Sequence, residues 1–178
     1  LSLPHAGTEL PDGVRRRMTE IGRTLPDTDW HIDRLYAFAL NLPATTVQAV
    51  FSRYAIDVNR DPSGASLYPG QATTGLCPTT TFAGEPLYLD GEEPDAHEIE
   101  ERRRTLFDPF HAALAEQIER VKAEHGYALL YDCHSIRSVV PRLFDGELPV
   151  LNLGTNDGKA CDPALRARLQ AVMAKSGL

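Results

Sequence analysis

Residues 127–142, YALLYDCHSIRSVVPR, carry the clearest indication of a fold in this sequence. The first five residues of this stretch are apolar or aromatic and follow a glycine, a pattern that favours a buried parallel strand over a helix. In open α/β sheets, ligand sites form outside the carboxyl ends of the strands. The stretch therefore predicts a central strand with a candidate site at its end, where four different polar side chains follow: Asp132, His134, Ser135 and Arg137.

Segments of strand and helix character alternate along the rest of the chain. Strands are expected at residues 1–4, 45–51 and 148–154, and a short strand or extended segment at 54–58. Helices are expected at 11–22, 29–39, 95–125 and 164–175, with an interruption at Pro109. Residues 62–94, rich in glycine and proline, are expected to form an ordered loop that covers the substrate. This alternation predicts an α/β fold with a mostly parallel sheet flanked by helices. The length of 178 residues suits one domain, residues 1–178.

Charge and cysteine content exclude several classes of partner. The net charge of −7, from 18 basic and 25 acidic residues, argues against a nucleic acid or an anionic membrane. Three scattered cysteines argue against a disulfide framework and fit a reducing compartment. No apolar run reaches the ~20 residues that span a bilayer, and no signal peptide is visible, so the cytoplasm is expected. The oligomeric state stays open.

A second histidine, His5, follows the first expected strand in the same kind of position as His134. If the two strands are neighbours in the sheet, their imidazoles converge on one point. The helix expected at 29–39 carries Asp29 and Asp33 four residues apart, on one face of its first turn. Two imidazoles, one carboxylate and an open position are typical of catalytic zinc sites, in which the open position holds the water that is activated. Capping of the helix by its acidic residues is the alternative interpretation of the aspartates.

Arginine and asparagine side chains supply groups that bind anions. Arg53, Asn59 and Arg60 lie close together in the sequence, and a guanidinium group donates a bidentate fork to a carboxylate while an amide adds a further donor. Together with Arg137, they predict a small anionic substrate. The alternative is that Arg53 and Arg60 lie on the surface and form ion pairs with Asp57 or Asp61.

The sequence resembles the N-formylglutamate amidohydrolase (N-formylglutamate deformylase) family in six segments that run in order over essentially the whole chain: LPHAGTELP, DTDWHIDRLY, SRYAIDVNR, SLYPGQATTGLCPTTTF, DCHSIRSVVPRLF and LNLGTNDG. The resemblance implies hydrolysis of N-formyl-L-glutamate to formate and L-glutamate, the last step of one route of histidine degradation. It also implies a fold similar to that of the zinc-dependent exopeptidases and amidases.

The resemblance further implies roles for single residues. His5, Asp33 and His134 match the places of the metal ligands, Asp29 is the alternate carboxylate, and Zn²⁺ or another divalent metal is the expected cofactor. The pair Asn59–Arg60 matches the pair that grips a substrate carboxylate in the exopeptidases. Apart from the resemblance, the expected substrate-binding set also includes Arg53, Ser135 and Arg137. The family runs beyond the point where this chain stops. The domain is therefore expected to be truncated at its C-terminus, with the general base beyond residue 178.

Other functions stay open at this point. The same scaffold could hydrolyse another N-acyl amino acid or a peptide amide. A non-catalytic domain could instead bind small dicarboxylates through Arg53, Arg60 and Arg137, and such a domain needs no metal. A serine hydrolase that uses Ser135 with His134 is disfavoured, because adjacent residues rarely orient as nucleophile and base and the chain has no G-x-S-x-G motif.

Overall fold

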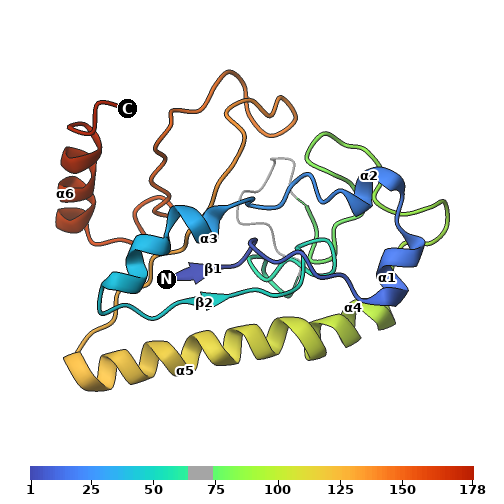
Figure 1. The fold of residues 1–178 in the computed structure, drawn as a ribbon, viewed down its shortest axis with the longest axis horizontal. Helices are drawn as coiled ribbons and strands as arrows, with labels where there is room; N and C mark the ends of the chain where they lie inside the picture. The colour runs from blue at the N-terminus through green and yellow to red at the C-terminus, as the bar shows by residue number, and fades with distance from the viewer. Residues whose placement is uncertain (64–73) are drawn as a thin grey trace. The chain divides into compact units, whose positions relative to one another are not determined.

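The computed structural model describes residues 1–63 and 74–178, which form two compact units, Leu1–Ile136 and Arg137–Leu178. The first unit begins with β1 (Ser2–Leu3), α1 (Asp12–Arg17), α2 (Glu20–Arg23), α3 (Ile32–Leu35), the 3-10 helix η1 (Ala37–Asn41) and β2 (Val47–Gln48). It continues with α4 (Ala96–Arg102), the π-helical segment η2 (Arg103–Phe107) and α5 (Asp108–His125). The second unit contains α6 (Pro163–Met173) (Figure 1). Of the covering loop expected at 62–94, residues 64–73 lie outside the described part of the chain.

Strand β1 lies between two parallel neighbours. It pairs with β2, with Ser2 opposite Val47, and on its other side Ser2 makes a parallel bridge to Asp132. Two backbone hydrogen bonds close this bridge, one from Ser2 N to the Tyr131 oxygen at 2.9 Å and one from Cys133 N to the Ser2 oxygen at 2.8 Å. The three segments run in the same direction, so their carboxyl ends lie at one edge.

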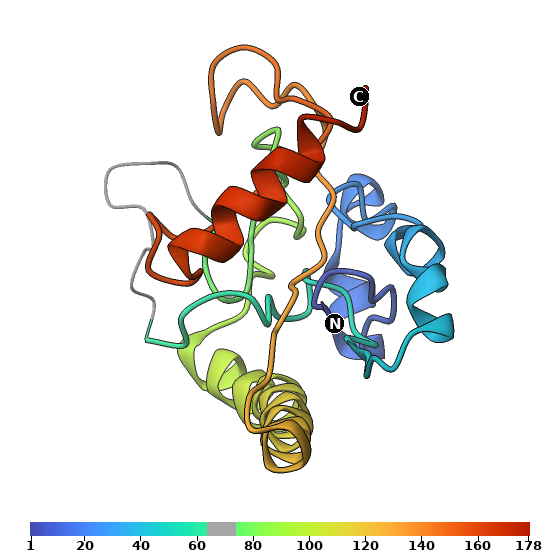
Figure 2. The same ribbon diagram turned by 90° about the vertical axis from the view of Figure 1, so that its left-hand side faces the viewer.

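Helices flank the strand pair. Figure 1 shows α5 running along one side of β1 and β2 and α3 lying on the other side, and α5 also lies below the N-terminal strand in Figure 2. The described residues thus contain a short parallel two-stranded sheet with helices, which agrees with the α/β class. The sheet is narrower in this part of the chain than the sequence pattern predicts.

Three clusters of buried side chains form the core of the first unit. One packs Val14 of α1 and Met18 with Tyr54 and Leu87, and the second packs η2 against Ile56. The third joins Leu3, Ile32 and Cys133, all of them at most 2% exposed. Each residue of the third cluster lies within three positions of a member of the polar group described below. The core therefore holds the three segments that carry this group.

The apolar run at 127–131 differs from its prediction as a buried strand. It makes only the parallel bridge at its end, and its side chains are largely exposed, with Tyr127 at 73% and Leu129 at 67%. The run lines an apolar cavity of about 440 Å³, together with residues of α5 such as Ile118. A strand is buried on both faces only when other residues pack against both. In the described part of the chain, this cavity lies between residues 127–131 and α5, so one face of the segment stays open.

Two other predicted strands are wrong. Residues 54–58 form turns, and every residue from 52 to 58 is buried, so the alternation in the sequence does not mark one exposed face. Residues 148–154 also form no strand, and Val150 is 75% exposed. A strand needs partners for its backbone groups, and the described residues provide no neighbouring strand for this segment.

The predicted helices differ mainly in where they break. The helix predicted at 11–22 is divided into α1 and α2, because Met18 becomes extended and pairs with Tyr88. The helix predicted at 29–39 begins only at Ile32, since His31 adopts a left-handed conformation with φ 63°. The predicted interruption near Pro109 is confirmed by η2, which ends two residues before it, and the C-terminal helix is confirmed as α6. Within the described ranges, no helix combines the length and the apolar character needed to cross a membrane.

Candidate metal centre

Three segments bring one polar side chain each to the carboxyl edge of β1. His5 follows β1, and His134 follows the segment that bridges Ser2, so the parallel pairing places the two imidazole rings with their centroids 4.9 Å apart. Asp29 lies in the loop before α3, and its backbone N donates to the His5 oxygen at 3.0 Å. Strand pairing and one backbone hydrogen bond thus bring together residues from three distant parts of the sequence.

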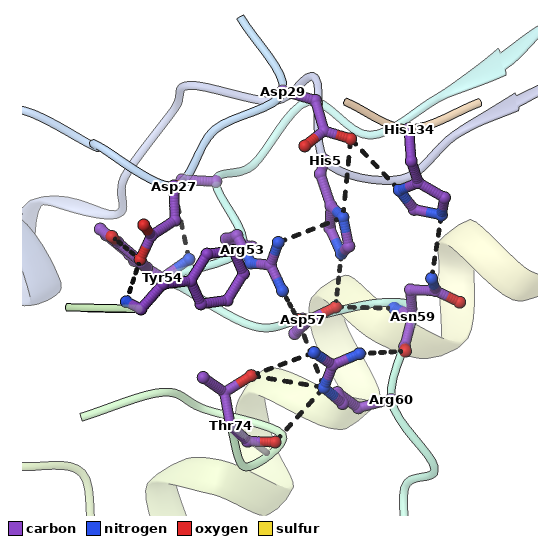
Figure 3. Close-up of polar contacts among 12 residues, drawn as sticks. His5, Asp27, Asp29, Arg53, Tyr54, Asp57, Asn59, Arg60, Thr74 and His134 are labelled. Atoms are coloured by element: carbon purple, nitrogen blue, oxygen red, sulfur yellow. Dashed lines mark hydrogen bonds and ion pairs between the residues drawn. The ribbon is translucent and has the colours of Figure 1, made fainter. Parts of the chain in front are cut away.

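The carboxylate of Asp29 lies between the two imidazoles (Figure 3). Its Oδ2 is 3.2 Å from Nδ1 of His134 and 3.8 Å from Nδ1 of His5. Asp29 and His5 are each 4% exposed, whereas the side chain of His134 is 35% exposed. The group is therefore buried on one side and open to solvent on the side of His134.

A second carboxylate lies behind each imidazole. Nε2 of His5 lies 2.7 Å from Oδ1 of Asp57, and Nε2 of His134 lies 2.9 Å from Oδ2 of Asp132. His134 also faces a carboxylate with its other ring nitrogen, since its Nδ1 lies 3.2 Å from Oδ2 of Asp29. An ionised carboxylate only accepts hydrogen bonds, so Nε2 of His5 carries a proton and donates it to Asp57. In the neutral ring of His5 the lone pair is then on Nδ1, which faces Asp29.

Burial, nearby charges and hydrogen bonds shift the pKa values of the two imidazoles in opposite directions. Burial lowers the pKa of His5, and the guanidinium of Arg53 lowers it further, so His5 is neutral at neutral pH. Burial alone would also lower the pKa of His134, but hydrogen bonds to Asp132 and Asp29 outweigh it and raise the pKa to about 9. In the protein without a cation, a proton on His134 balances the charge of the neighbouring carboxylates.

Arg53 and Asp57 form a buried ion pair beneath His5. Nη2 of Arg53 donates to Oδ2 of Asp57 at 2.5 Å, and the guanidinium group stacks 4.6 Å from the ring centre of Phe82. Nη1 of Arg53 also lies 3.3 Å from Nδ1 of His5. Burial alone would raise the pKa of Asp57, but the positive charge of Arg53 and the hydrogen bond from His5 hold it well below its usual range.

Asn59 and Arg60 lie on the other side of Asp57. The amide nitrogen of the Asn59 side chain is 3.1 Å from Nε2 of His134, and the backbone N of Asn59 donates to Oδ1 of Asp57 at 3.0 Å. Nη1 of Arg60 donates to the backbone oxygen of Asn59 at 3.0 Å, and the side chain of Arg60 is 28% exposed. Asn59 thus lies beside His134, and the guanidinium group of Arg60, the next residue, also contacts Thr74.

The distances and the chemistry of this group fit a divalent metal. Zinc bonds of ~2.0–2.1 Å in a tetrahedron place ligand atoms roughly 3.3 Å apart. Here the ligand atoms of His5, Asp29 and His134 all lie within 4.8 Å of one another. Two imidazole lone pairs beside a carboxylate repel one another unless a cation or a proton lies among them. Imidazole and carboxylate bind several divalent metals, so these donors leave the identity of the metal open.

The structure brings together some of the residues predicted from the sequence and separates others. His5, Asp29 and His134 form one group, with Arg53, Asn59 and Arg60 beside it. Asp33 is exposed on α3, lines a different cavity and lies outside the group. Ser135 is exposed, and Arg137 belongs to the second unit. Roles for these last two in substrate binding stay predictions.

Sequence reasoning missed the roles of Asp57 and Asp132. Both appear in the sequence as ordinary neighbours, one as an ion-pair partner for an arginine and the other as a polar residue after a strand. One signal for Asp57 is present, because it stands between Ile56 and Val58 in a segment otherwise rich in apolar side chains. An unpaired carboxylate is rarely buried among such residues, so the position points to a partner.

Comparisons with known proteins show the family of this chain. The family model described as N-formylglutamate amidohydrolase matches residues 1–178. A protein of Pseudomonas aeruginosa named N-formylglutamate deformylase is 53% identical over 174 residues, which are 98% of this chain and 65% of that protein. A protein of Pseudomonas putida with the same name is 49% identical over 176 residues, which are 99% of this chain and 66% of that protein.

The fold is also similar to a solved structure. The crystal structure of an N-formylglutamate amidohydrolase from Ralstonia eutropha matches with a TM-score of 0.72 at 24% identity, over 99% of this chain and 68% of that one. At this identity the similarity shows the fold alone. This chain spans 65% and 66% of the lengths of the two Pseudomonas relatives. Because the family model covers the whole sequence, the chain belongs to the N-formylglutamate amidohydrolase family.

Proposed function

We propose that this chain catalyses the metal-dependent hydrolysis of N-formyl-L-glutamate to formate and L-glutamate. The observation that carries the proposal is the convergence of His5, Asp29 and His134 on one point in a member of an amidohydrolase family. The names of the two Pseudomonas relatives, both N-formylglutamate deformylases, support the choice of substrate. The proposal includes a mostly parallel sheet like that of the zinc-dependent exopeptidases, which the parallel pairing of β1 with β2 supports.

In this proposal His5, Asp29 and His134 hold Zn²⁺ or another divalent metal. Asp29 is preferred to Asp33 as the carboxylate ligand, because Asp33 is exposed and lies outside the group. A bound divalent metal would lower the pKa of water and polarise a carbonyl oxygen, and both effects promote amide hydrolysis at neutral pH. The chain contributes through Asp57, which accepts the Nε2 proton of His5 and leaves the lone pair of its Nδ1 atom facing Asp29.

The anionic substrate would be held by Asn59 and Arg60. The Asn59 side chain lies 3.1 Å from Nε2 of His134, and the side chain of Arg60, the next residue, is 28% exposed. A guanidinium group can bind a carboxylate through two parallel hydrogen bonds. Arg53 is 4% exposed and is engaged with Asp57 and His5. We therefore assign Arg53 an electrostatic role beneath the imidazole rather than direct contact with the substrate.

Metal content and formate release test this function together. The wild-type chain, offered zinc and then dialysed, should retain about one equivalent by elemental analysis and release formate from N-formyl-L-glutamate. His134→Ala should lose both properties, whereas His97→Ala, an exposed histidine on α4, should keep both. No retained metal in the wild type would contradict the proposed mechanism and favour a domain that only binds dicarboxylates.

A panel of substrates separates the proposed reaction from hydrolysis of other amides. N-formyl-L-glutamate should be turned over faster than N-acetyl-L-glutamate or an N-formyl amino acid with an uncharged side chain. Arg60→Gln should lower kcat/KM for N-formyl-L-glutamate by roughly 10- to 100-fold, because a hydrogen bond to a charged group contributes about 1.5–3 kcal/mol. Equal turnover of all three substrates would contradict the assignment of the substrate.

A further inference from the structure

Asp57 is a fully buried carboxylate, with 0% of its surface exposed, and both of its oxygens are occupied. Oδ1 accepts from Nε2 of His5 at 2.7 Å and from the backbone N of Asn59 at 3.0 Å. Oδ2 accepts from Nη2 of Arg53 at 2.5 Å and lies 3.7 Å from Nε of Arg60. A single carboxylate thus contacts a candidate metal ligand and the segment that carries the candidate substrate-binding pair (Figure 3).

This arrangement allows His5 only one neutral tautomer. With the proton on Nδ1, the lone pair of Nε2 would point at a buried carboxylate oxygen 2.7 Å away, and that contact is repulsive. With the proton on Nε2, the ring donates to Asp57 and presents its lone pair at Nδ1, toward Asp29. The ring is 4% exposed, so no water can readily replace the carboxylate as its partner.

We propose that Asp57 is the positioning residue that fixes the tautomer and the ring orientation of His5 for metal binding. The inference rests on the proposed function, because it assumes that Nδ1 of His5 is a metal ligand. Arg53 makes the arrangement possible, since a carboxylate this deeply buried needs a paired positive charge. The contact of Asp57 with the Asn59 backbone also holds the substrate-binding segment in register with the metal group.

The pair formed by Asp132 and His134 provides an internal comparison. Asp132 also accepts from the Nε2 atom of an imidazole, but its side chain is 37% exposed, so water can take its place. Removal of the Asp57 carboxylate should therefore weaken metal binding more than removal of the Asp132 carboxylate. Partners of this kind behind a metal-bound imidazole typically change metal affinity by 10- to 100-fold.

Zinc affinity measured by competition with a chromophoric chelator tests the assignment. Asp57→Asn should bind zinc roughly 10- to 100-fold more weakly than the wild type, and Asp132→Asn should lose less. Asp61→Asn serves as the matched control, because it removes the same charge from an exposed side chain. Within the described residues, the Asp61 carboxylate accepts hydrogen bonds only from Ser63. Zinc affinity of a folded Asp57→Asn protein within twofold of the wild type would overturn the proposal.

The tautomer of His5 provides a second measurement that does not depend on folding of the variant. In metal-free wild-type protein labelled with ¹⁵N in its histidines, the chemical shifts of His5 should show the proton on Nε2 and a lone pair on Nδ1. A proton on Nδ1 would overturn the proposal even if Asp57→Asn does not fold. A wild type that binds zinc with the expected tautomer but releases no formate would contradict the proposed function and leave the role of Asp57 standing.

Discussion

The hydroxyl group of Tyr54 anchors the loop that carries Asp29, and its removal has a predictable cost. Tyr54 is 1% exposed, and its hydroxyl donates to Oδ2 of Asp27 at 2.6 Å. The backbone N of Phe82 donates to the same oxygen at 2.7 Å, and Asp27 is itself 5% exposed. Asp27 precedes Asp29 by two residues, so this buried network lies directly behind a proposed metal ligand.

The substitution Tyr54→Phe removes one oxygen and keeps the buried ring. A hydrogen bond to a charged group contributes about 1.5–3 kcal/mol net, and the aromatic packing is retained because the two rings have the same shape. We expect the free energy of unfolding to fall by about 2 kcal/mol, which corresponds to a decrease in Tm of roughly 4–8 °C for a chain of this length. Denaturant and thermal unfolding followed by circular dichroism measure both quantities.

Tyr127→Phe is the matched control, since it removes the same atom from a side chain that is 73% exposed. It should change stability by no more than about 0.5 kcal/mol. The double variant with Asp27→Ala should be less destabilised than the sum of the two single variants, because both remove the same hydrogen bond. Equal stability of Tyr54→Phe and Tyr127→Phe would refute the reasoning, since the buried hydroxyl would then contribute nothing.

Two further predictions concern backbone packing and pH. Gly7→Ala should lower the free energy of unfolding, measured with denaturant, by about 1–3 kcal/mol, because the added Cβ would lie 2.2 Å from the backbone oxygen of Phe51. Gly13→Ala is the control: its Cβ meets open space in α1, so it should raise the free energy of unfolding by up to about 1 kcal/mol. Burial alone would raise the pKa of Glu98, but hydrogen bonds from Arg102 and a second arginine lower it. The free energy of unfolding of the wild type should therefore exceed that of Glu98→Gln by its full amount above pH ~4.3, the pKa of Glu98 in the unfolded chain. This difference should decrease as the pH falls through the lower pKa of Glu98 in the folded chain. A difference that does not change with pH in denaturant unfolding would contradict this.

The two histidines of the candidate centre could be predicted because each directly follows an extended segment. His5 and His134 need only parallel pairing of these segments to meet, and one bridge between Ser2 and Asp132 is sufficient. The prediction therefore survived the error at residues 127–131, where the expected strand is largely exposed. The position of His134 just after the bridge to Ser2 is what the prediction required, and the length of the strand before it made no difference.

The choice between Asp29 and Asp33 could not be made from the sequence. A helix that starts at residue 29 would place both carboxylates on one face, but His31 in its left-handed conformation delays the helix to Ile32. A non-glycine residue in this conformation is uncommon, so no pattern of side chains predicts it. The delayed start leaves Asp29 in the loop that is hydrogen-bonded to His5 and moves Asp33 to an exposed position.

The role of Asp57 depends on burial, which is a property of the folded chain. In sequence, an aspartate four residues after Arg53 indicates a surface ion pair as readily as a buried one. Burial distinguishes the two cases, because an exposed Asp57 could exchange Arg53 and His5 for water, whereas at 0% exposure it must keep both. The same carboxylate then fixes the imidazole of His5, so a residue that resembles an ordinary ion-pair partner determines which nitrogen is available to a metal.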